Sequence, residues 1–588
     1  MNKKVALLLL SIALGATVAA YVRTLPYQFV YDDTDQIVKN TAVHSWAFVP
    51  HYFASDVWPH ASADEFSNYY RPVFQLWLLL NYKVFGLNPV WWHFTSLLVH
   101  LVVVSLVFLL ALTLTRDELL AGGAAALFGL HPIHIEAVTW ISGVTEPLTA
   151  AFFLTSLLCY FKSLRKADSN SGTDWWFIGS LGFYVVALLE KETALVLPVV
   201  IFCYRWLFST ADVNEETNPS SKRIDRQRFL IAVRSTLPYL VLTALYLVAR
   251  FFALNGLGHS LMHLPLKVVV YTWPSILLFY AKSLVWPLGL SAFYDTPYVV
   301  SLSPVQFILP ALILLLIAIA LFYWARRSRL VAFFSLWMLL PILPLLNLAV
   351  FKDGEIAHDR YLYLPSIGFC ILVAYAVRHL RLGSARIFGQ PAAQVLVLLV
   401  LACLLGIATV YQSKFWASDL SLAARGVLMA PHNNMAANDF AKELGLRGNY
   451  QAAIPIFLQV IERKPSYWLP NFNIGVAYYQ IGNLPKAEYY FRKAIKIYPS
   501  DAAELRFLGF TLLELGRIDE AATMLRKAIS LDSSAPDQHY ALGTILKQQK
   551  DFEGALKEFK VEQNINPNRP DLQRDLTETE SQLTANPK

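Results

Sequence analysis

The chain has 588 residues, of which 56% are hydrophobic and only 15% are charged, with a formal net charge of +7 at pH 7. A soluble globular chain carries about 25% charged residues, so this composition excludes a wholly soluble protein. The positive balance does not indicate nucleic-acid binding, because Lys and Arg in the apolar part lie mostly in loops between apolar runs, where they set membrane orientation. Nearly all strongly apolar sequence lies before residue 412, so the chain has two parts.

Eleven apolar segments are predicted to span a membrane, since a spanning helix needs roughly 20 mostly apolar residues. We interpret the first as an uncleaved anchor, with a cleaved signal peptide as the alternative. A twelfth apolar run, 267–288, contains Pro274 and Pro287, which together with Lys282 favour a surface or re-entrant helix. The eleven predicted spans are 4–20, 92–115, 118–135, 144–164, 174–190, 192–208, 231–252, 304–325, 328–350, 361–380 and 392–412.

Five basic clusters predict the orientation of these spans, because positive residues in short loops stay on the cytoplasmic side. When all five are placed in the cytoplasm, an even number of spans lies between successive clusters, provided that 267–288 stays outside. The N-terminus is then cytoplasmic, and the C-terminal part lies on the other side, as does a first external loop at 21–91. The clusters are Lys3-Lys4, Lys162/Arg165/Lys166, Lys222/Arg223/Arg226/Arg228, Arg326/Arg327/Arg329 and Arg378/Arg381/Arg386.

After Pro431 the sequence repeats every 34 residues. Prolines recur at this interval, and so do small residues that let two antiparallel helices pack closely, which is typical of tetratricopeptide repeats. Such a solenoid offers a concave peptide-binding surface, with a spacer or oligomerisation module as the alternative. The recurring residues are Pro431, Pro465 and Pro499; Ala441, Gly475, Gly509 and Gly543; and Ala453, Ala487, Ala521 and Ala555. The predicted boundaries are 1–412 for the membrane domain, 413–430 for a linker, 431–566 for four repeats and 567–588 for a capping helix and tail.

Acids, histidines and bases recur in every predicted external loop, close to the ends of apolar helices. Ionisable groups at a membrane boundary are costly unless they pair or act, so the sequence predicts a site at the outer surface. The candidate residues are Asp32, Asp33, Arg71, His131, His134, Glu136, Lys191, Glu192, His358, Asp359 and Arg360.

The adjacent carboxylates of the first external loop suggest a catalytic base. Asp32 would accept a proton from a hydroxyl nucleophile, and Asp33 would orient or bind; a solvated acidic turn is the plainer alternative. Arg360 and Lys191 are candidate anchors for an anionic lipid headgroup. Neighbouring acids such as Asp359 could instead neutralise them locally.

A second group, His131, His134 and Glu136, has residue types that ligate a divalent metal or donate hydrogen bonds to a phosphate. Two histidines three residues apart also occur as ordinary residues at a helix end, so a metal is a possible cofactor without being required. Further along, Gly143-Val144-Thr145-Glu146 brings no cation of its own to pair with the acid of Glu146.

Six segments carry a resemblance to a known family, in order along essentially the whole chain. They are YDDTDQIVKN after the first span, YYRPV, LHPIHIEAVTWISG, LLEKETALVLP, AHDRYLYLPSIGF and the trailing repeats. The combination resembles the transmembrane-and-tetratricopeptide-repeat O-mannosyltransferases and their bacterial relatives, which are similar to glycosyltransferases of the GT-C fold. The resemblance implies an all-α polytopic helix bundle followed by a repeat solenoid.

The same resemblance implies a function. A hexose, mannose in the family, would pass from a polyprenyl-phosphate donor in the membrane lipid to a hydroxyl acceptor, expected to be a protein Ser or Thr bound by the repeats. The family places a catalytic acid directly after the first span, which matches Asp32 and Asp33 here, and the donor phosphate would meet Arg360, Lys191, Arg71 and His358. The reaction would take place in the periplasm of a bacterium or in the lumen of the endoplasmic reticulum.

Two other classes of function stay open at this stage. One is a membrane-anchored scaffold whose repeats recruit envelope proteins and whose spans have lost activity. The other is a transporter of a lipid-linked saccharide. A transporter should carry ionisable residues deep within its helices, whereas the acids here lie at outer helix ends, which favours an enzyme.

Overall fold

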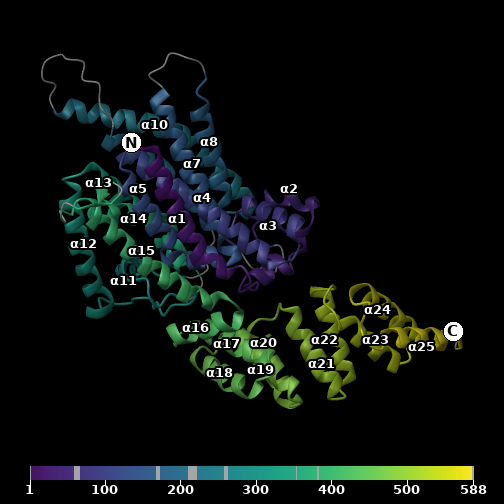
Figure 1. Ribbon diagram of the computed structural model, residues 1–588. Helices are drawn as coiled ribbons and strands as arrows, with labels where there is room; N and C mark the ends of the chain where they lie inside the picture. Colours follow the sequence, from purple (N-terminus) through teal and green to yellow (C-terminus); the bar gives the residue numbers. More distant parts are fainter. Residues whose placement is uncertain are drawn as a thin grey trace. The chain divides into compact units, whose positions relative to one another are not determined.

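The fold is described from a computed structural model of residues 2–58, 67–166, 173–208, 221–256, 263–351, 354–380, 383, 385–387 and 389–585. Arg381 of the last basic cluster and the tail residues 586–588 lie outside this part of the chain, as do the side chains of Lys222 and Arg223. The described residues form helices, apart from one antiparallel pair of two-residue strands, β1 (Arg386–Ile387) and β2 (Gln390–Pro391). The predicted all-α class is confirmed (Figure 1).

The chain divides into two compact units, Met1–Met429 and Ala430–Lys588. The segment 413–430, predicted as a linker, contains a helix that belongs to the first unit. The helices of the first unit are α1 (Lys3–Tyr21), α2 (Val49–Tyr52), α3 (Pro72–Phe85), α4 (Pro89–Thr115), α5 (Glu118–Leu130), α6 (Ile135–Thr139), α7 (Thr145–Lys166), α8 (Trp175–Glu190), α9 (Leu197–Phe208), α10 (Ser221–Leu254), α11 (Leu266–Val285), α12 (Leu309–Ala325), α13 (Arg329–Leu339), α14 (Tyr363–Arg378), α15 (Ala392–Ser413) and α16 (Asp419–Met429).

Nine helices among the described residues are long and apolar enough to cross a membrane. Eight of them coincide with predicted spans. The other three predicted spans contain shorter helices, α5, α8 and α9. The first of these stops at Leu130 because His131, which precedes a proline, is extended. Among the described residues, nine helices therefore have the length of a span, and whether the three shorter helices also cross the membrane stays a prediction.

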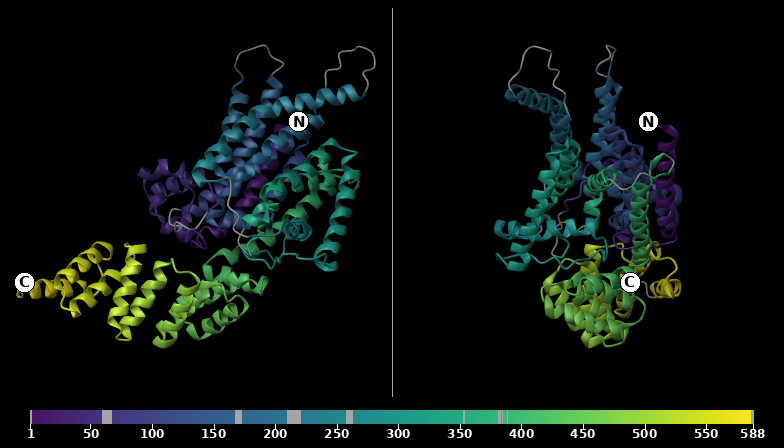
Figure 2. Two further views of the ribbon diagram at one scale, coloured as in Figure 1. Left: turned by 180° about the vertical axis from the view of Figure 1, so that it is seen from behind. Right: turned by 60° about the vertical axis from the view of Figure 1, so that its left-hand side comes forward.

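The ninth long helix is α11, which covers most of the run 267–288 that the sequence predicts to be a surface or re-entrant helix. It has 20 residues and includes Pro274, so length and composition alone also allow a span. In the left-hand view of Figure 2, α11 is seen nearly end-on, whereas α12 lies in the plane of the picture. The two helices therefore run across each other. The position of α11 outside the membrane stays a prediction.

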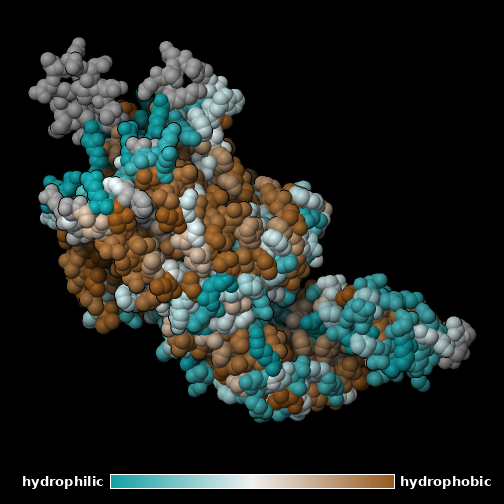
Figure 3. All heavy atoms as spheres, in the orientation of Figure 1, coloured by the Kyte–Doolittle hydropathy of each residue, from teal (hydrophilic) through white to brown (hydrophobic). Residues whose placement is uncertain are grey.

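The interior of the first unit is built around α5, which packs against α1, α4, α14 and α15. Small residues make this close packing possible: a Cβ on Gly122 would lie 2.8 Å from Leu9, and one on Gly123 would lie 2.7 Å from Leu398. By contrast with α5, helix α12 is almost entirely exposed, since only 6% of its apolar stretch is buried inside the protein. Figure 3 shows the visible face of this unit covered largely by hydrophobic side chains. A surface of this kind is stable in lipid and not in water, so the chain is an integral membrane protein.

The second unit consists of paired helices at the predicted spacing. Gly475 and Gly543 stand where two helices of a pair touch, and a Cβ at either would lie about 2.6–2.7 Å from the ring of Phe491 or Phe559. The small residues therefore have the packing role that the 34-residue pattern predicts. The helices are α17 (Asn434–Leu446), α18 (Tyr450–Arg463), α19 (Trp468–Gln480), α20 (Leu484–Ile497), α21 (Ala502–Glu514), α22 (Ile518–Leu531), α23 (Gln538–Gln548), α24 (Phe552–Ile565) and α25 (Leu572–Ala585).

Candidate active site

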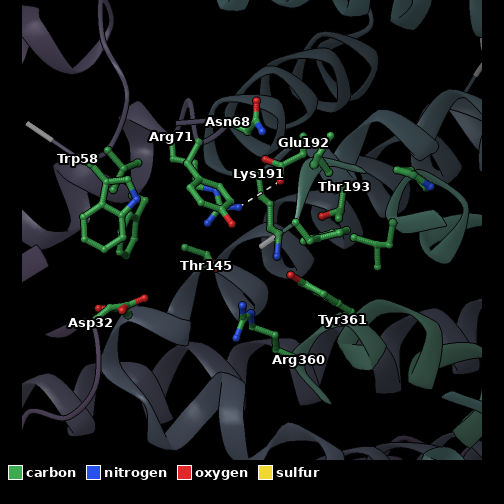
Figure 4. A pocket seen from close by; sticks show the side chains of 18 of the residues that line it. Asp32, Trp58, Asn68, Arg71, Thr145, Lys191, Glu192, Thr193, Arg360 and Tyr361 are labelled. Carbon is green, nitrogen blue, oxygen red and sulfur yellow. Dashed lines mark hydrogen bonds and ion pairs between the residues drawn. The ribbon is translucent and has the colours of Figure 1, made fainter. Parts of the chain in front are cut away.

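A cavity of about 390 Å³ opens where the predicted external loops of the first unit meet. It contains five of the predicted site residues, and Figure 4 shows them around one space. They come from three predicted external loops that are far apart in sequence, which agrees with a site assembled at one end of the helix bundle. The five are Asp32, Arg71, Lys191, Glu192 and Arg360.

Two acids among the described residues line this cavity, and Asp32 is the one that is not paired with Arg71. It follows Tyr31, whose φ of 58° lies in the left-handed region that residues with a Cβ rarely adopt. The structure gives the half-buried Asp32 carboxylate no hydrogen bond from the described residues. Burial raises the pKa of Asp32 to about 7, and the charge of Glu355 adds to this effect while Arg360 opposes it. A carboxylate with this pKa can accept a proton at neutral pH and release it again.

Asp33 has a different environment. Its side chain is fully buried, and it accepts hydrogen bonds from the Ser142 backbone N at 2.9 Å, the Ser142 hydroxyl at 2.6 Å and the Val30 backbone N at 3.1 Å. Burial raises its pKa to about 7, although the hydrogen bonds from Ser142 and Val30 act in the other direction. Asp33 does not line the cavity, and its hydrogen bonds tie the first loop to the loop that carries Ser142.

Glu136 lies beneath the cavity and holds Arg360. Its carboxylate accepts a hydrogen bond from the Arg360 backbone N at 3.0 Å and forms an ion pair with the Arg360 guanidinium, and it lies 3.4 Å from His358 Nδ1. Burial opposes ionisation of Glu136, but Arg360 and His358 overcome this cost and hold its pKa at about 2. Arg360 reaches the cavity, whereas His358 and Glu136 do not.

Two further cations of the cavity are paired with acids from other segments. Lys191 forms a buried ion pair with Glu146, and Arg71 Nη2 lies 3.1 Å from Glu192 Oε1. Glu146, which has no cation beside it in the sequence, thus pairs in space with Lys191, 45 positions further along the chain. Burial lowers the pKa of Lys191, and Glu146 opposes this shift. Each of these cations is held by its carboxylate in a fixed position beside the cavity.

His131 and His134 take part in packing contacts and do not converge on a metal position with Glu136. His131 Nε2 lies 3.0 Å from the Leu284 carbonyl oxygen, and His134 Nε2 lies 2.8 Å from the Ser366 hydroxyl. Among the described residues, no group of three or more His, Cys, Asp or Glu side chains could hold a metal ion. The suggested metal site is therefore not supported, because Glu136 is bound to Arg360 and both histidines face other partners.

Asp359 also lies outside the cavity lining. It is buried and accepts a hydrogen bond from the Tyr294 hydroxyl at 2.6 Å. It does not pair with the neighbouring Arg360, which binds Glu136 instead. The ion pair of Arg360 is therefore formed with Glu136 and not with Asp359, the alternative that the sequence left open.

Several residues of the cavity lining were not predicted from the sequence. The most important is Arg250, which is buried at the end of α10 and donates to the Asn68 backbone oxygen at 2.6 Å. A cation at the outer end of a predicted span is a signal that could have identified it. The aromatic and amide side chains carry no such signal in sequence. The other residues of the lining that were missed include Trp58, Asn68, Trp140, Thr193 and Asn347.

The chain is similar over most of its length to proteins that are named as O-mannosyl-transferases. It is 26% identical to human protein O-mannosyl-transferase TMTC3 over 94% of this chain and 64% of that protein, and 26% identical to mouse TMTC1 over 84% of this chain and 58% of that protein. Human TMTC2 is 34% identical over 33% of this chain and 23% of its own length. The resemblance seen in the sequence is thus confirmed. The chain spans less than two thirds of the length of these relatives.

The repeat unit matches two family models, described as tetratricopeptide repeat at residues 438–502 and TPR repeat at residues 509–550. Among solved structures, MamA is similar at 18% identity with a TM-score of 0.24, covering 26% of this chain and 82% of that one. YrrB, a TPR protein with an unusual peptide-binding site, is similar at 18% identity with a TM-score of 0.25, covering 27% of this chain and 82% of that one. The repeat class predicted from the 34-residue interval is confirmed by the family models.

Proposed function

We propose that this protein is a membrane glycosyltransferase that transfers a hexose from a polyprenyl-phosphate donor to a hydroxyl group of a protein acceptor. The observation that carries the proposal is one cavity in which a half-buried carboxylate with a pKa of about 7 faces fixed cations. The names of the relatives favour mannose as the sugar.

In this mechanism Asp32 is the general base. It accepts the proton of the acceptor hydroxyl while that oxygen bonds to the anomeric carbon of the sugar, and the bond from this carbon to the phosphate oxygen breaks. The polyprenyl phosphate leaves with the electron pair of that bond. One displacement inverts the anomeric configuration.

The cations of the cavity stabilise the leaving phosphate. Arg360, Lys191 and Arg71 are already fixed by Glu136, Glu146 and Glu192, so no reorganisation is needed as negative charge develops on the phosphate. His358 does not line the cavity, and its proposed part is to help Glu136 hold Arg360.

The reaction is proposed to take place on the non-cytoplasmic face. The basic clusters of the sequence place the opposite ends of the helices in the cytoplasm, and the cavity residues come from predicted external segments or from the outer ends of predicted spans. The repeats would bind the acceptor protein on that same face, since a tetratricopeptide solenoid offers a concave surface for peptides.

The test compares Asp32→Asn with Asp33→Asn in the purified full-length protein, using a labelled polyprenyl-phosphate hexose and candidate acceptor peptides. We expect Asp32→Asn to lower kcat by about 10² or more, the size that loss of a general base explains. Its thermal midpoint at pH 8 should equal or exceed that of the wild type. The reason is that an acid whose pKa is raised in the folded state lowers the stability of the protein as pH rises from about 4 to about 7, so the full cost is present at pH 8.

Asp33→Asn is the matched control. Three donors point at the Asp33 carboxylate, and an amide cannot accept from all of them, so this variant should lose thermal stability first. Equal turnover by the wild type and Asp32→Asn would remove Asp32 from the chemistry. Absence of turnover with any donor would overturn the proposed function.

A further inference from the structure

The segment that ends the first unit is bound to the loop that carries Asp32. The Gln28 backbone N donates to the Ala417 carbonyl oxygen at 3.2 Å, and the Tyr31 backbone N donates to Asp419 Oδ1 at 2.7 Å. The buried Trp416 ring stacks on Trp140, with ring centroids 6.2 Å apart and an interplanar angle of 24°. This segment is therefore part of the surroundings of the site, not a free connection.

The contact to Tyr31 matters because of its backbone conformation. Tyr31 has a φ of 58°, and a tyrosine adopts this left-handed conformation only where its surroundings impose it. Asp419 receives the amide hydrogen of this same residue, and Asp32 is the next residue along the chain. The direction of the Asp32 side chain thus depends on a conformation that Asp419 stabilises.

On the other side of Asp32, Asp33 is tied to Ser142 and Val30. Asp32 therefore lies between two fixed neighbours, one bound by α16 and one bound by the loop of Ser142. Its own carboxylate stays available for a substrate in the cavity.

We infer that Asp419 is a positioning residue for the reaction of Asp32, an inference that rests on the proposed function. Asp419 is the first residue of α16, where the amino-terminal end of the helix favours a negative charge. It acts through the Tyr31 amide and touches neither substrate. Misplacing a catalytic group by about 1 Å can lower a rate by about 10², so loss of this contact is expected to lower kcat without weakening donor binding.

The experiment uses the full-length protein with the labelled polyprenyl-phosphate hexose and compares Asp419→Ala, Asp419→Asn and Ser421→Ala. We expect Asp419→Ala to lower kcat about tenfold or more while the donor KM stays within about twofold, since the cations of the cavity are untouched. Asp419→Asn keeps an oxygen that can accept from Tyr31, so it should stay within about threefold of the wild type. Within the described part of the chain, the Ser421 hydroxyl hydrogen-bonds with Ser418 in the same turn, and Ser421→Ala should match the wild type.

Two further readouts separate positioning from folding. In Asp419→Ala the amide of Tyr31 should exchange with deuterium faster than in the wild type, and the acid limb of kcat/KM should move to lower pH as Asp32 becomes better solvated. The substitution Tyr31→Asn, added to Asp419→Ala, should restore part of kcat because asparagine adopts the left-handed region more readily.

The inference is overturned if Asp419→Ala lowers only the thermal midpoint and leaves kcat and the pH profile unchanged. It is also overturned if Asp419→Asn is as inactive as Asp419→Ala. If the wild type turns over no donor, the proposed function fails instead. The exchange rate of the Tyr31 amide then still decides whether Asp419 holds this backbone.

Discussion

The ion pairs beside the cavity differ in burial from a network of ion pairs on the surface of the repeat unit. In the membrane unit, Lys191 and Glu146 are 3% and 4% exposed, and each is the partner of the other inside the protein. In the repeat unit, Arg517 and Glu520 are 41% and 49% exposed and belong to a surface network with Arg492 and Glu488. The same types of charged residue thus form pairs inside the protein in one case and at a water-exposed surface in the other.

The difference shows what each set of pairs is for. An exposed pair is screened by water and salt and contributes little to stability. A buried pair costs desolvation of both charges, and its members depend strongly on each other. Since the buried pairs surround the cavity, their main effect is to hold cations where an anion would bind.

The largest effect is expected from breaking a buried pair. Glu136→Gln removes the charge that compensates Arg360, and removal of one partner of a buried pair costs about 3–5 kcal/mol in the free energy of unfolding. The variant should show a strongly lowered thermal midpoint in detergent and a loss of turnover, because Arg360 is no longer fixed. Glu553→Gln, at an exposed position of the repeat unit, is the control and should leave both unchanged. A stable, active Glu136→Gln protein would contradict the role given to this pair.

A smaller effect is expected from pH. Because burial raises the pKa of Asp32 to about 7, and the base acts in its ionised form, kcat/KM should fall as pH drops below about 7, approaching tenfold per pH unit. The measurement is kcat/KM for the donor between about pH 5.5 and pH 8.5 at constant ionic strength. An acid limb near pH 4 would mean that Asp32 is solvated like an ordinary surface acid or is not the base.

The smallest effect is expected from the surface network. Arg517→Ala removes pairs that are largely exposed to water, so the thermal midpoint should fall by less than about 2 °C and turnover should not change. Raising the salt concentration should make even this difference disappear. A loss as large as that of Glu136→Gln would show that the repeat unit relies on charge as strongly as the membrane unit does.

Much of the fold could be predicted from the sequence because its signals are periodic or local. A run of apolar residues indicates a membrane helix by its length, and the 34-residue interval of Gly475, Gly509 and Gly543 identifies the repeats. The helix is shorter than the predicted span where the apolar run continues past the helix end, as at His131-Pro132. Apolar composition does not reveal a turn that is itself buried.

The candidate site could be predicted only in part. The sequence placed Asp32, Lys191 and Arg360 on the same side of the membrane, and the structure brings them to one cavity. It could not show that Glu146 pairs with Lys191, or that Glu136 and not Asp359 binds Arg360, since these partners are set by the packing of distant loops. The contact between Asp419 and Tyr31 joins residues 388 positions apart and leaves no trace in local sequence.

The pairing of Lys191 and Arg360 with acids from other segments has a consequence for how this sequence can diverge. A single replacement of Glu146 or Glu136 would strand a buried charge, so such changes are tolerated only together with a change at Lys191 or Arg360. Descendant sequences should therefore alter these positions jointly or keep both. Correlated substitution between Glu146 and Lys191, or between Glu136 and Arg360, would then mark the cavity in proteins whose overall similarity to this chain has faded.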